Sequence, residues 1–333
     1  MKKLLTRPQM LYEARQNGNG HALGLEVLFF IIVFFVSQSI LSIPVTVAML
    51  LRVFLTAEGQ AILLEMMEGG SSDALYTMLA APSDAIMLVQ LFSTALATAA
   101  AIVYCRIIEK RSLSSMGLRR RGLLREYGIG TLIGIALISV CVGLCLPFGA
   151  IRLEAQAFSP VLWVLFLLGF LIQGMSEEVL CRGYMMVSVS RRHSLVLAVL
   201  TNSVLFGLLH IFNPGFGLLP LLNIVLFGIL ESVYVLKRGD LWGACAIHSI
   251  WNFFQGNVFG ISVSGMELST SPLRATVNSS FEWLNGGSFG LEGGVAVTLV
   301  LAIACVLVLF LMPNSETEAE NEQVNSNLPS LAD

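Results

Sequence analysis

Charged residues are scarce in this sequence. Asp, Glu, Lys and Arg make up 12% of the 333 residues, whereas hydrophobic residues make up 56%. Soluble domains carry about 25% charged and about 45–50% apolar residues, so this composition excludes an ordinary soluble domain. It indicates an all-α, polytopic membrane protein whose helices face lipid as well as one another.

Cysteine is present but forms none of its usual motifs. No CxxC pair occurs and the loops contain no cysteine, which argues against a disulfide framework and against a thiolate zinc site. The cysteines are therefore interpreted as small packing residues of membrane helices. They are Cys105, Cys141, Cys145, Cys181, Cys245 and Cys305.

The two ends of the chain are polar and differ in charge. The first apolar run begins near Ala22 and is too long for the core of a signal peptide, so we expect it to stay as the first membrane helix. Residues 1–21 are expected to form a basic cytoplasmic arm. Residues 313–333 contain four glutamates and no apolar run, which predicts a disordered acidic tail.

Between these ends, residues 22–312 are expected to form the membrane-embedded domain. About eight apolar runs have roughly the 20 residues that cross a bilayer. After the first run, Pro44 is followed by more apolar sequence, which leaves open one long kinked helix or a span with a surface segment. The runs are residues 23–43, 85–105, 127–146, 160 onward, 195–212, 216–236, 241–259 and 291–312.

The basic residues are distributed unevenly between the two sets of loops. Arg52, Arg152 and Arg274 lie on one side and Arg182 lies within a span, which leaves 15 of the 19 lysines and arginines for the other side. Because cytoplasmic loops are enriched in Lys and Arg, this split predicts that both termini are cytoplasmic. The basic run 119–121 is interpreted as part of this topology signal, and no nucleic-acid partner is expected.

Two carboxylates and a guanidinium interrupt the apolar run that begins at residue 160. On insertion scales each such charge costs about 2.5–3.5 kcal/mol at the centre of a membrane helix, so these groups must pair, line a wet cavity or lie near the membrane edge. Glu178 and Arg182 are four residues apart and can form an ion pair. Glu177 points about 100° away, which leaves its carboxylate free for chemistry. A salt-bridged helix end at the membrane surface is the alternative interpretation.

Two further spans carry polar groups on one face. His210 follows Phe206 by four residues, and His248 precedes Asn252 by four, so each pair shares a helix face. If these groups converge with the carboxylates, a carboxylate and a histidine can activate water, and a second histidine and an amide can donate to an oxyanion. Glu231, two turns before a basic pair, is interpreted as a surface-paired carboxylate outside this site.

The three motifs resemble those of a known family when they are taken together. Glu177-Glu178-x-x-x-Arg182, Phe206-x-x-x-His210 and His248-x-x-x-Asn252 occur in this order on three separate spans. This pattern is similar to that of the CPBP intramembrane protease family, which includes type II CAAX prenyl endopeptidases and bacteriocin-immunity proteins. The resemblance covers a motif core of about residues 160–257.

The resemblance implies a role for each motif residue. Glu177 would be the catalytic carboxylate, with His210 helping it to activate water. His248 and Asn252 would form the oxyanion hole, and Glu178 and Arg182 would brace the site. Proteins of this kind are often described as metalloproteases, and Glu177, His210 and His248 are also a ligand set for catalytic zinc. The HExxH arrangement is absent, and we favour the metal-free scheme because it uses each residue once.

Three functions remain open at this point. The first is an intramembrane endopeptidase in the plasma membrane of a bacterium, acting on a peptide or a membrane protein, with a prenylated CAAX-type substrate as one candidate. The second is a non-enzymatic immunity or scaffold protein. The third is a proton-coupled transporter, which is disfavoured because the two halves of the chain show no internal repeat.

Overall fold

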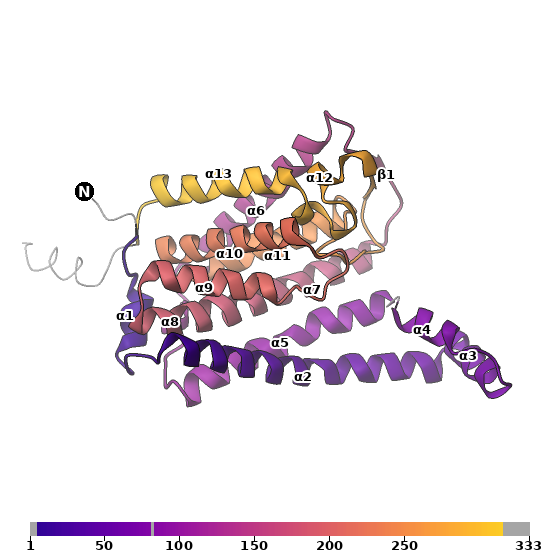
Figure 1. The fold of residues 1–333 in the computed structure, drawn as a ribbon, viewed down its shortest axis with the longest axis horizontal. Helices are drawn as coiled ribbons and strands as arrows, with labels where there is room; N and C mark the ends of the chain where they lie inside the picture. Colours follow the sequence, from indigo (N-terminus) through magenta and orange to yellow (C-terminus); the bar gives the residue numbers. More distant parts are fainter. Residues whose placement is uncertain (1–4, 81–82, 316–333) are drawn as a thin grey trace, which may run out of the picture.

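A computed structural model describes residues 5–80 and 83–315 of the chain. The described part is mostly helical, and long helices run roughly side by side in a bundle (Figure 1). The N-terminal half contains α1 (Gln9–Arg15), α2 (Leu23–Leu55), α3 (Ala57–Met67), α4 (Asp73–Ala80), α5 (Asp84–Ile107), the short 3₁₀ turn η1 (Ser114–Met116) and α6 (Leu123–Cys145).

The C-terminal half carries the predicted motifs. Its long elements are α7 (Pro160–Glu178), the π-helical segment η2 (Val179–Met186), α8 (Val187–Arg192), α9 (Leu195–Leu208), α10 (Leu218–Arg238), α11 (Trp242–Asn257) and α13 (Val295–Leu311). Four short elements precede α13: η3 (Ser279–Phe281), α12 (Glu282–Asn285), η4 (Gly287–Phe289) and η5 (Leu291–Gly293).

Each predicted apolar run coincides with a long helix or helical stretch. Of these, α2, α5, α6, the continuous stretch Pro160–Arg192 and α10 are long and apolar enough to cross a membrane, whereas α9 and α13 are shorter apolar helices. A polytopic helical membrane protein is thus confirmed, while eight crossings and cytoplasmic termini stay predictions. Pro44 lies inside the 33-residue helix α2, so the single long helix is the correct alternative.

The structure adds one small sheet to the expected all-α bundle. β1 (Ile151–Ala155) pairs antiparallel with β2 (Leu273–Val277), with Ile151 opposite Val277. The two strands come from loops that lie far apart in sequence. They cover the end of the bundle opposite the N-terminus (Figure 1).

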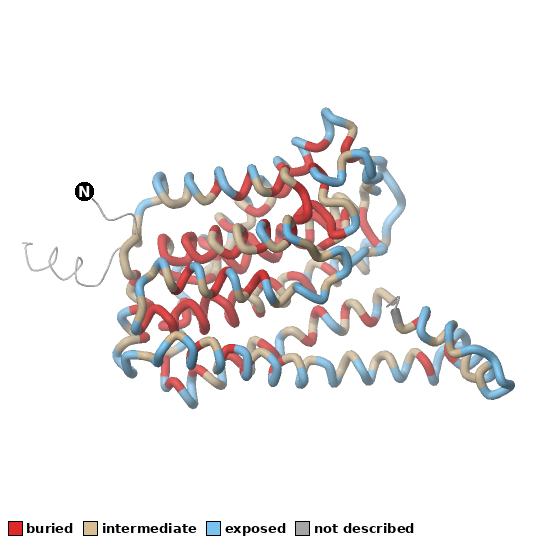
Figure 2. The backbone as a smooth tube through the Cα atoms, viewed as in Figure 1, coloured by how far each residue is buried: buried red, intermediate tan, exposed pale blue. Residues whose placement is uncertain are grey.

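The buried core is concentrated in the C-terminal half of the molecule. Buried residues crowd the stretch from α7 to α11, whereas α2, α3 and α4 are mainly exposed or half-buried (Figure 2). Close packing here depends on glycine: a Cβ atom at Gly130 of α6 would lie 2.2 Å from the carbonyl oxygen of Gly243 on α11. A Cβ atom at Gly134 would likewise lie 2.9 Å from the carbonyl oxygen of Ile247. Small residues at this spacing let the two helices approach closely, and the contact positions the helix that carries His248.

Both ends of the described chain lie at the same end of the bundle. A Cβ atom at Gly239, in the turn after α10, would lie 3.4 Å from Pro8 Cβ and 3.1 Å from Ser315 Oγ. The predicted basic arm is described from residue 5 onward and forms α1. Residues 1–4, and the predicted acidic tail from residue 316 onward, lie outside the described residues.

Candidate active site

The Glu-Glu stretch lies at the junction of two kinds of helix. α7 ends at Glu178 and continues without a break into η2, whose residues are all buried. π-helical turns are rare and are frequent at functional sites. The junction places Glu177 and Glu178 in the interior of the bundle, midway along the stretch Pro160–Arg192.

Glu178 and Arg182 form the ion pair that their spacing predicts. Arg182 Nη1 donates to Glu178 Oε1 at 2.9 Å, and both side chains are completely buried. The guanidinium carbon also lies 4.6 Å from the centroid of the Phe206 ring, a cation–π distance. The pair therefore belongs to the interior, and the alternative of a salt bridge at the membrane surface is wrong.

His248 is held between the two glutamates. Its Nδ1 lies 2.9 Å from Glu178 Oε1, and because a carboxylate only accepts, Nδ1 carries the proton. Its Nε2 lies 3.5 Å from Glu177 Oε2. Glu178 thus orients the ring, and Nε2 can donate a hydrogen bond only when the imidazole is protonated.

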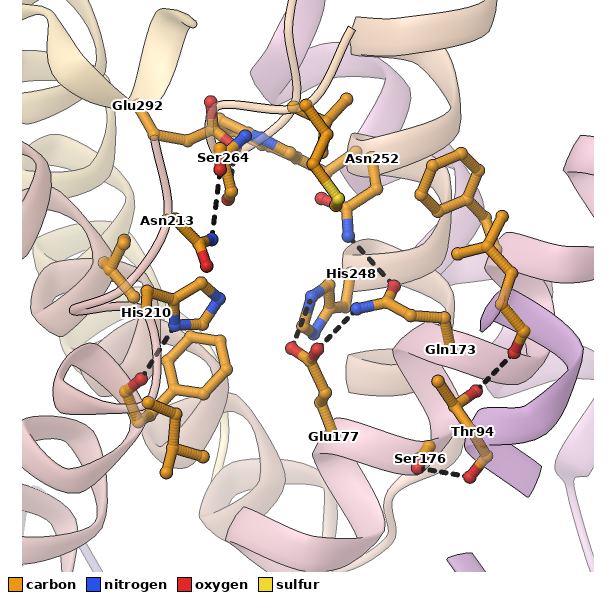
Figure 3. A pocket seen from close by; sticks show the side chains of 18 of the residues that line it. Thr94, Gln173, Ser176, Glu177, His210, Asn213, His248, Asn252, Ser264 and Glu292 are labelled. Atoms are coloured by element: carbon orange, nitrogen blue, oxygen red, sulfur yellow. Dashed lines mark hydrogen bonds and ion pairs between the residues drawn. The ribbon is translucent and has the colours of Figure 1, made fainter. Parts of the chain in front are cut away.

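Gln173 connects Glu177 to Asn252, and sequence reasoning missed it. Gln173 Nε2 donates to Glu177 Oε1 at 2.6 Å, and Asn252 Nδ2 donates to Gln173 Oε1 at 3.0 Å (Figure 3). Glu177 Oε2 has no hydrogen-bond partner among the described residues. Gln173 therefore fixes one oxygen of the carboxylate, while the other oxygen faces His248 Nε2 at 3.5 Å. Its spacing of one helical turn before Glu177 was the available signal.

His210 faces this group from the opposite wall of a cavity (Figure 3). Its Nδ1 lies 2.9 Å from the carbonyl oxygen of Phe206, so Nδ1 carries the proton and Nε2 is left as the acceptor. The Phe206 ring packs edge-on against His210 at 5.0 Å and against His248 at 5.8 Å between centroids. The Phe-x-x-x-His spacing thus has a physical basis. The carbonyl oxygen of Phe206 anchors His210, and its ring packs against both histidines.

The cavity between these walls has a volume of about 280 Å³. Its far wall carries a carboxylate that the sequence analysis did not select, Glu292 in η5. Glu292 Oε1 lies 3.2 Å from Ser264 Oγ, and Gln255 donates to the other oxygen. Asn213 Nδ2 donates to the carbonyl oxygen of Ser264 at 3.0 Å, so this wall joins the loop after α11 to the segment after α9.

Glu231 is placed differently from the sequence prediction. Its side chain is completely buried in α10, and it interacts electrostatically with Glu178 and Arg182. The interpretation as a surface-paired carboxylate is therefore wrong. Helical spacing to Lys237 suggested a surface position, but the packing of α10 against η2 turns Glu231 inward.

The residues of the alternative zinc site do not gather as metal ligands. Glu177 and His248 lie on one wall and His210 lies on the other (Figure 3). Within residues 5–80 and 83–315, no group of three or more His, Cys, Asp or Glu side chains is arranged to hold a metal ion. The ligand set does not fit zinc in this arrangement, and no reaction step is derived through a metal.

The fold and the site together define a helical membrane protein with a buried glutamate–histidine centre. Residues 159–254 match the family model for the type II CAAX prenyl endopeptidase Rce1-like family, and this segment runs from the start of α7 through most of α11. The resemblance in the sequence is thereby confirmed, and at family level the match supports an intramembrane protease of the CAAX type. Comparison with curated proteins and with solved structures gives no match.

Proposed function

We propose that this protein is an intramembrane endopeptidase that hydrolyses a peptide bond of a membrane-associated substrate with a water molecule. One observation carries the proposal: Glu177, one of whose carboxylate oxygens has no described hydrogen-bond partner, lines the same cavity as His210, His248 and Asn252. A carboxylate and two histidines at one cavity in a membrane domain are costly to maintain without a function.

In the proposed reaction, Glu177 acts as the general base. With His210 positioning the water through Nε2, the water oxygen attacks the carbonyl carbon of the scissile bond while Glu177 takes one water proton. The C–N bond then breaks, and Glu177 returns the proton to the leaving nitrogen. One water molecule is consumed, and the products are a carboxylic acid and an amine.

His248 and Asn252 are proposed to stabilise the oxyanion of the tetrahedral intermediate. Asn252 can use the amide N–H that Gln173 does not occupy, and His248 donates through Nε2 in its protonated form. Glu178 would pair with the protonated ring through Nδ1. Once Glu177 has taken the water proton, it no longer competes as an anion for the Nε2 hydrogen 3.5 Å away, which can then donate to the oxyanion. Donors fixed in advance stabilise a developing charge without reorganisation during the reaction.

The experiment uses a bacterial host that produces either the wild-type protein or Glu177→Gln in its plasma membrane. The membranes of the two strains are then compared. Mass spectrometry of new peptide termini should find cleavage products with wild type that are absent with Glu177→Gln at equal protein abundance. Glu65→Gln, an exposed carboxylate on α3, is the matched control and should behave as wild type. Identical termini in all three membranes would favour a non-enzymatic scaffold instead.

Metal dependence is tested on wild-type protein purified in detergent. The metal-free scheme predicts that turnover of a substrate found in this way is unchanged by chelation. A stoichiometric zinc ion whose removal abolishes turnover would replace it by a metal mechanism.

A further inference from the structure

The cavity lies toward one end of the bundle. Its lining comes from the first half of α5, the first turns of α10, the second half of α11, the loop at 263–268 and the start of α13. These segments belong to the end of the molecule that carries β1 and β2, opposite the N-terminus (Figure 1). From Glu177 and His248, the cavity therefore extends along the bundle axis toward the end that carries β1 and β2.

In the other direction the site has a closed floor. Leu180, which lines the cavity, is followed in η2 by Tyr184 and Met185, and both of these side chains are completely buried. The Tyr184 ring packs against Tyr104 at 4.9 Å and against Phe30 at 6.1 Å between centroids. Side chains from α2, α5 and η2 thus close the bundle below the glutamates.

A second layer of buried charge lies beneath these aromatic rings. Arg111 Nε donates to Glu109 Oε2 at 2.7 Å, and Arg191 binds the other oxygen of Glu109. Ser188 Oγ donates to the same carboxylate, and all four residues are buried. These contacts tie the loop after α5 to α8 below the site.

The wall of the cavity on this side includes irregular backbone. α9 has 14 residues, about 21 Å of helix at 1.5 Å per residue, against a hydrocarbon core of about 30 Å. The chain then continues without regular structure through residues 209–217, the segment that carries His210 and Asn213. Irregular backbone at membrane depth is tolerated where it is buried in protein or lines an aqueous cavity.

The wall formed by α2 and α5 is also polar at this level. Gln38 of α2 and Gln90 of α5 line the cavity, together with Thr94. Amide side chains in membrane helices are unfavourable against lipid and suit a hydrated space or the main chain of an extended peptide. The polar lining therefore reaches from the glutamates to helices outside the matched family segment.

Charge distribution assigns the two ends to the two sides of the membrane. The closed end carries the basic segments 106–125, 191–192 and 237–238, whereas Arg52, Arg152 and Arg274 lie at the open end. The positive-inside rule places the closed end in the cytoplasm. The open end of the cavity then faces the opposite, outer side of the membrane.

We propose that the cavity takes its water and its substrate from the outer half of the membrane. The substrate class is a membrane protein or membrane-bound peptide whose scissile segment lies in the outer leaflet or at the outer surface. The claim that a substrate enters the cavity rests on the proposed function. The direction from which water and other molecules reach the cavity depends only on the fold. A prenylated C-terminus anchored at the cytoplasmic surface would meet the closed end of the bundle.

Access is tested by cysteine labelling without any substrate. Gln38→Cys and Leu209→Cys place thiols in the cavity lining, and a membrane-impermeant methanethiosulfonate is applied to whole cells and to inside-out vesicles. Both variants should be labelled in whole cells, as is Ser280→Cys in the exposed outer loop. Met185→Cys, on the closed floor, should be labelled from neither side, and wild type gives the background of the native cysteines.

Labelling of both cavity variants from inside-out vesicles alone would overturn the proposal, and so would no labelling from either side in folded protein. The same labelling repeated in Glu177→Gln separates access from catalysis, because the thiol reaction does not need turnover. The termini found by comparing wild type with Glu177→Gln give the second readout. They should map to outer-leaflet or outer-surface segments, and termini confined to cytoplasmic segments would contradict the substrate class while leaving the protease function intact.

Discussion

Arg182 is the residue on which the buried charges depend most. It donates to Glu178 and lies over the ring of Phe206, with no exposed surface. Removing one partner of a buried ion pair leaves the other charge uncompensated and costs about 3–5 kcal/mol. We therefore predict that Arg182→Ala lowers the yield of folded protein, measured by size-exclusion chromatography in detergent.

Two variants control this prediction. Arg182→Lys keeps the charge but loses the planar fork, so its folded yield should lie between those of Arg182→Ala and wild type. Glu177→Gln keeps the size of its side chain, which is not part of the pair, and should fold normally. If Arg182→Ala accumulates normally while Glu177→Gln does not, the roles of the two residues are misassigned.

Asn252 tests the proposed oxyanion site. Its amide already donates to Gln173 at 3.0 Å, which fixes the group before a substrate arrives. Removing one oxyanion donor typically costs about 10²–10³ in rate. We predict that Asn252→Ala lowers kcat by about this factor with little change in KM, because the interaction forms only in the transition state.

The outcome that would contradict this reading is specific. Near-normal turnover of Asn252→Ala, combined with a stoichiometric metal that is lost in His248→Ala, would make His248 a metal ligand. Size-exclusion profiles of both variants must match wild type for the comparison to count. Turnover and metal content are measured on the same preparations.

At this scale the sequence predicts what lies along one helix. The pairing of Glu178 with Arg182 follows from the helical period and is present in the structure. The contact between Glu178 and His248 joins residues 70 positions apart; the cost of polar groups in a membrane and the family pattern suggested that these spans meet, but no spacing along the chain predicts the contact itself. Glu292 and Glu231 were not placed in the site because their neighbours come from distant segments of the chain.

At the scale of elements, the glycines of α6 set the distance to α11. A Cβ atom at Gly130 would meet the Gly243 carbonyl oxygen at 2.2 Å, whereas one at Gly128 would have no atom within 4 Å. Overpacking costs typically about 1–3 kcal/mol. We predict that Gly130→Ala lowers both folded yield and turnover, because α11 carries His248 and Asn252, while Gly128→Ala leaves both unchanged.

This pair of alanine variants has a simple internal check. The two glycines lie on the same helix, so the gain in helix propensity is equal and only the packing differs. Folded yield is measured by size-exclusion chromatography, and turnover is measured per folded molecule. Equal behaviour of the two variants would show that α6 and α11 are not in close contact.

The helices were predictable because hydrophobic runs of membrane length leave few alternatives. Each predicted run contains a helix, and most boundaries differ by a few residues, as for 127–146 and α6 at Leu123–Cys145, whereas α2 continues from the predicted end at residue 43 to Leu55. The π-helical segment η2 and the β1–β2 pair were not predicted. The strands depend on a distant partner, as in the pairing of Ile151 with Val277, and a short π-helical segment inside a long helix changes the apolar period too briefly to be recognised.

At the scale of the whole molecule, one end of the helical bundle is closely packed and the other end contains the cavity. The closed end gathers both ends of the described chain near Gly239, together with the buried charges of Glu109 and Arg111. The other end holds the candidate active-site cavity and the irregular segments that line it. The closed end packs below Glu177, His210 and His248, which come from three separate motifs.

The number of membrane crossings is the prediction that concerns the entire chain. It depends most on the short helix α9, because its 14 residues extend about 21 Å and reach the outer surface only through residues 209–217.

If α9 and this segment cross together, Arg192 and Phe212 lie on opposite sides of the membrane. With an impermeant thiol reagent, Phe212→Cys should be labelled in whole cells and Arg192→Cys in inside-out vesicles alone. Phe212 is 95% exposed, so access to its replacement is not limited by protein packing. Labelling of both positions from the same side would remove one crossing and would separate the two termini across the membrane. Eight crossings keep them on one side, which agrees with the common position of Pro8 and Ser315 beside Gly239.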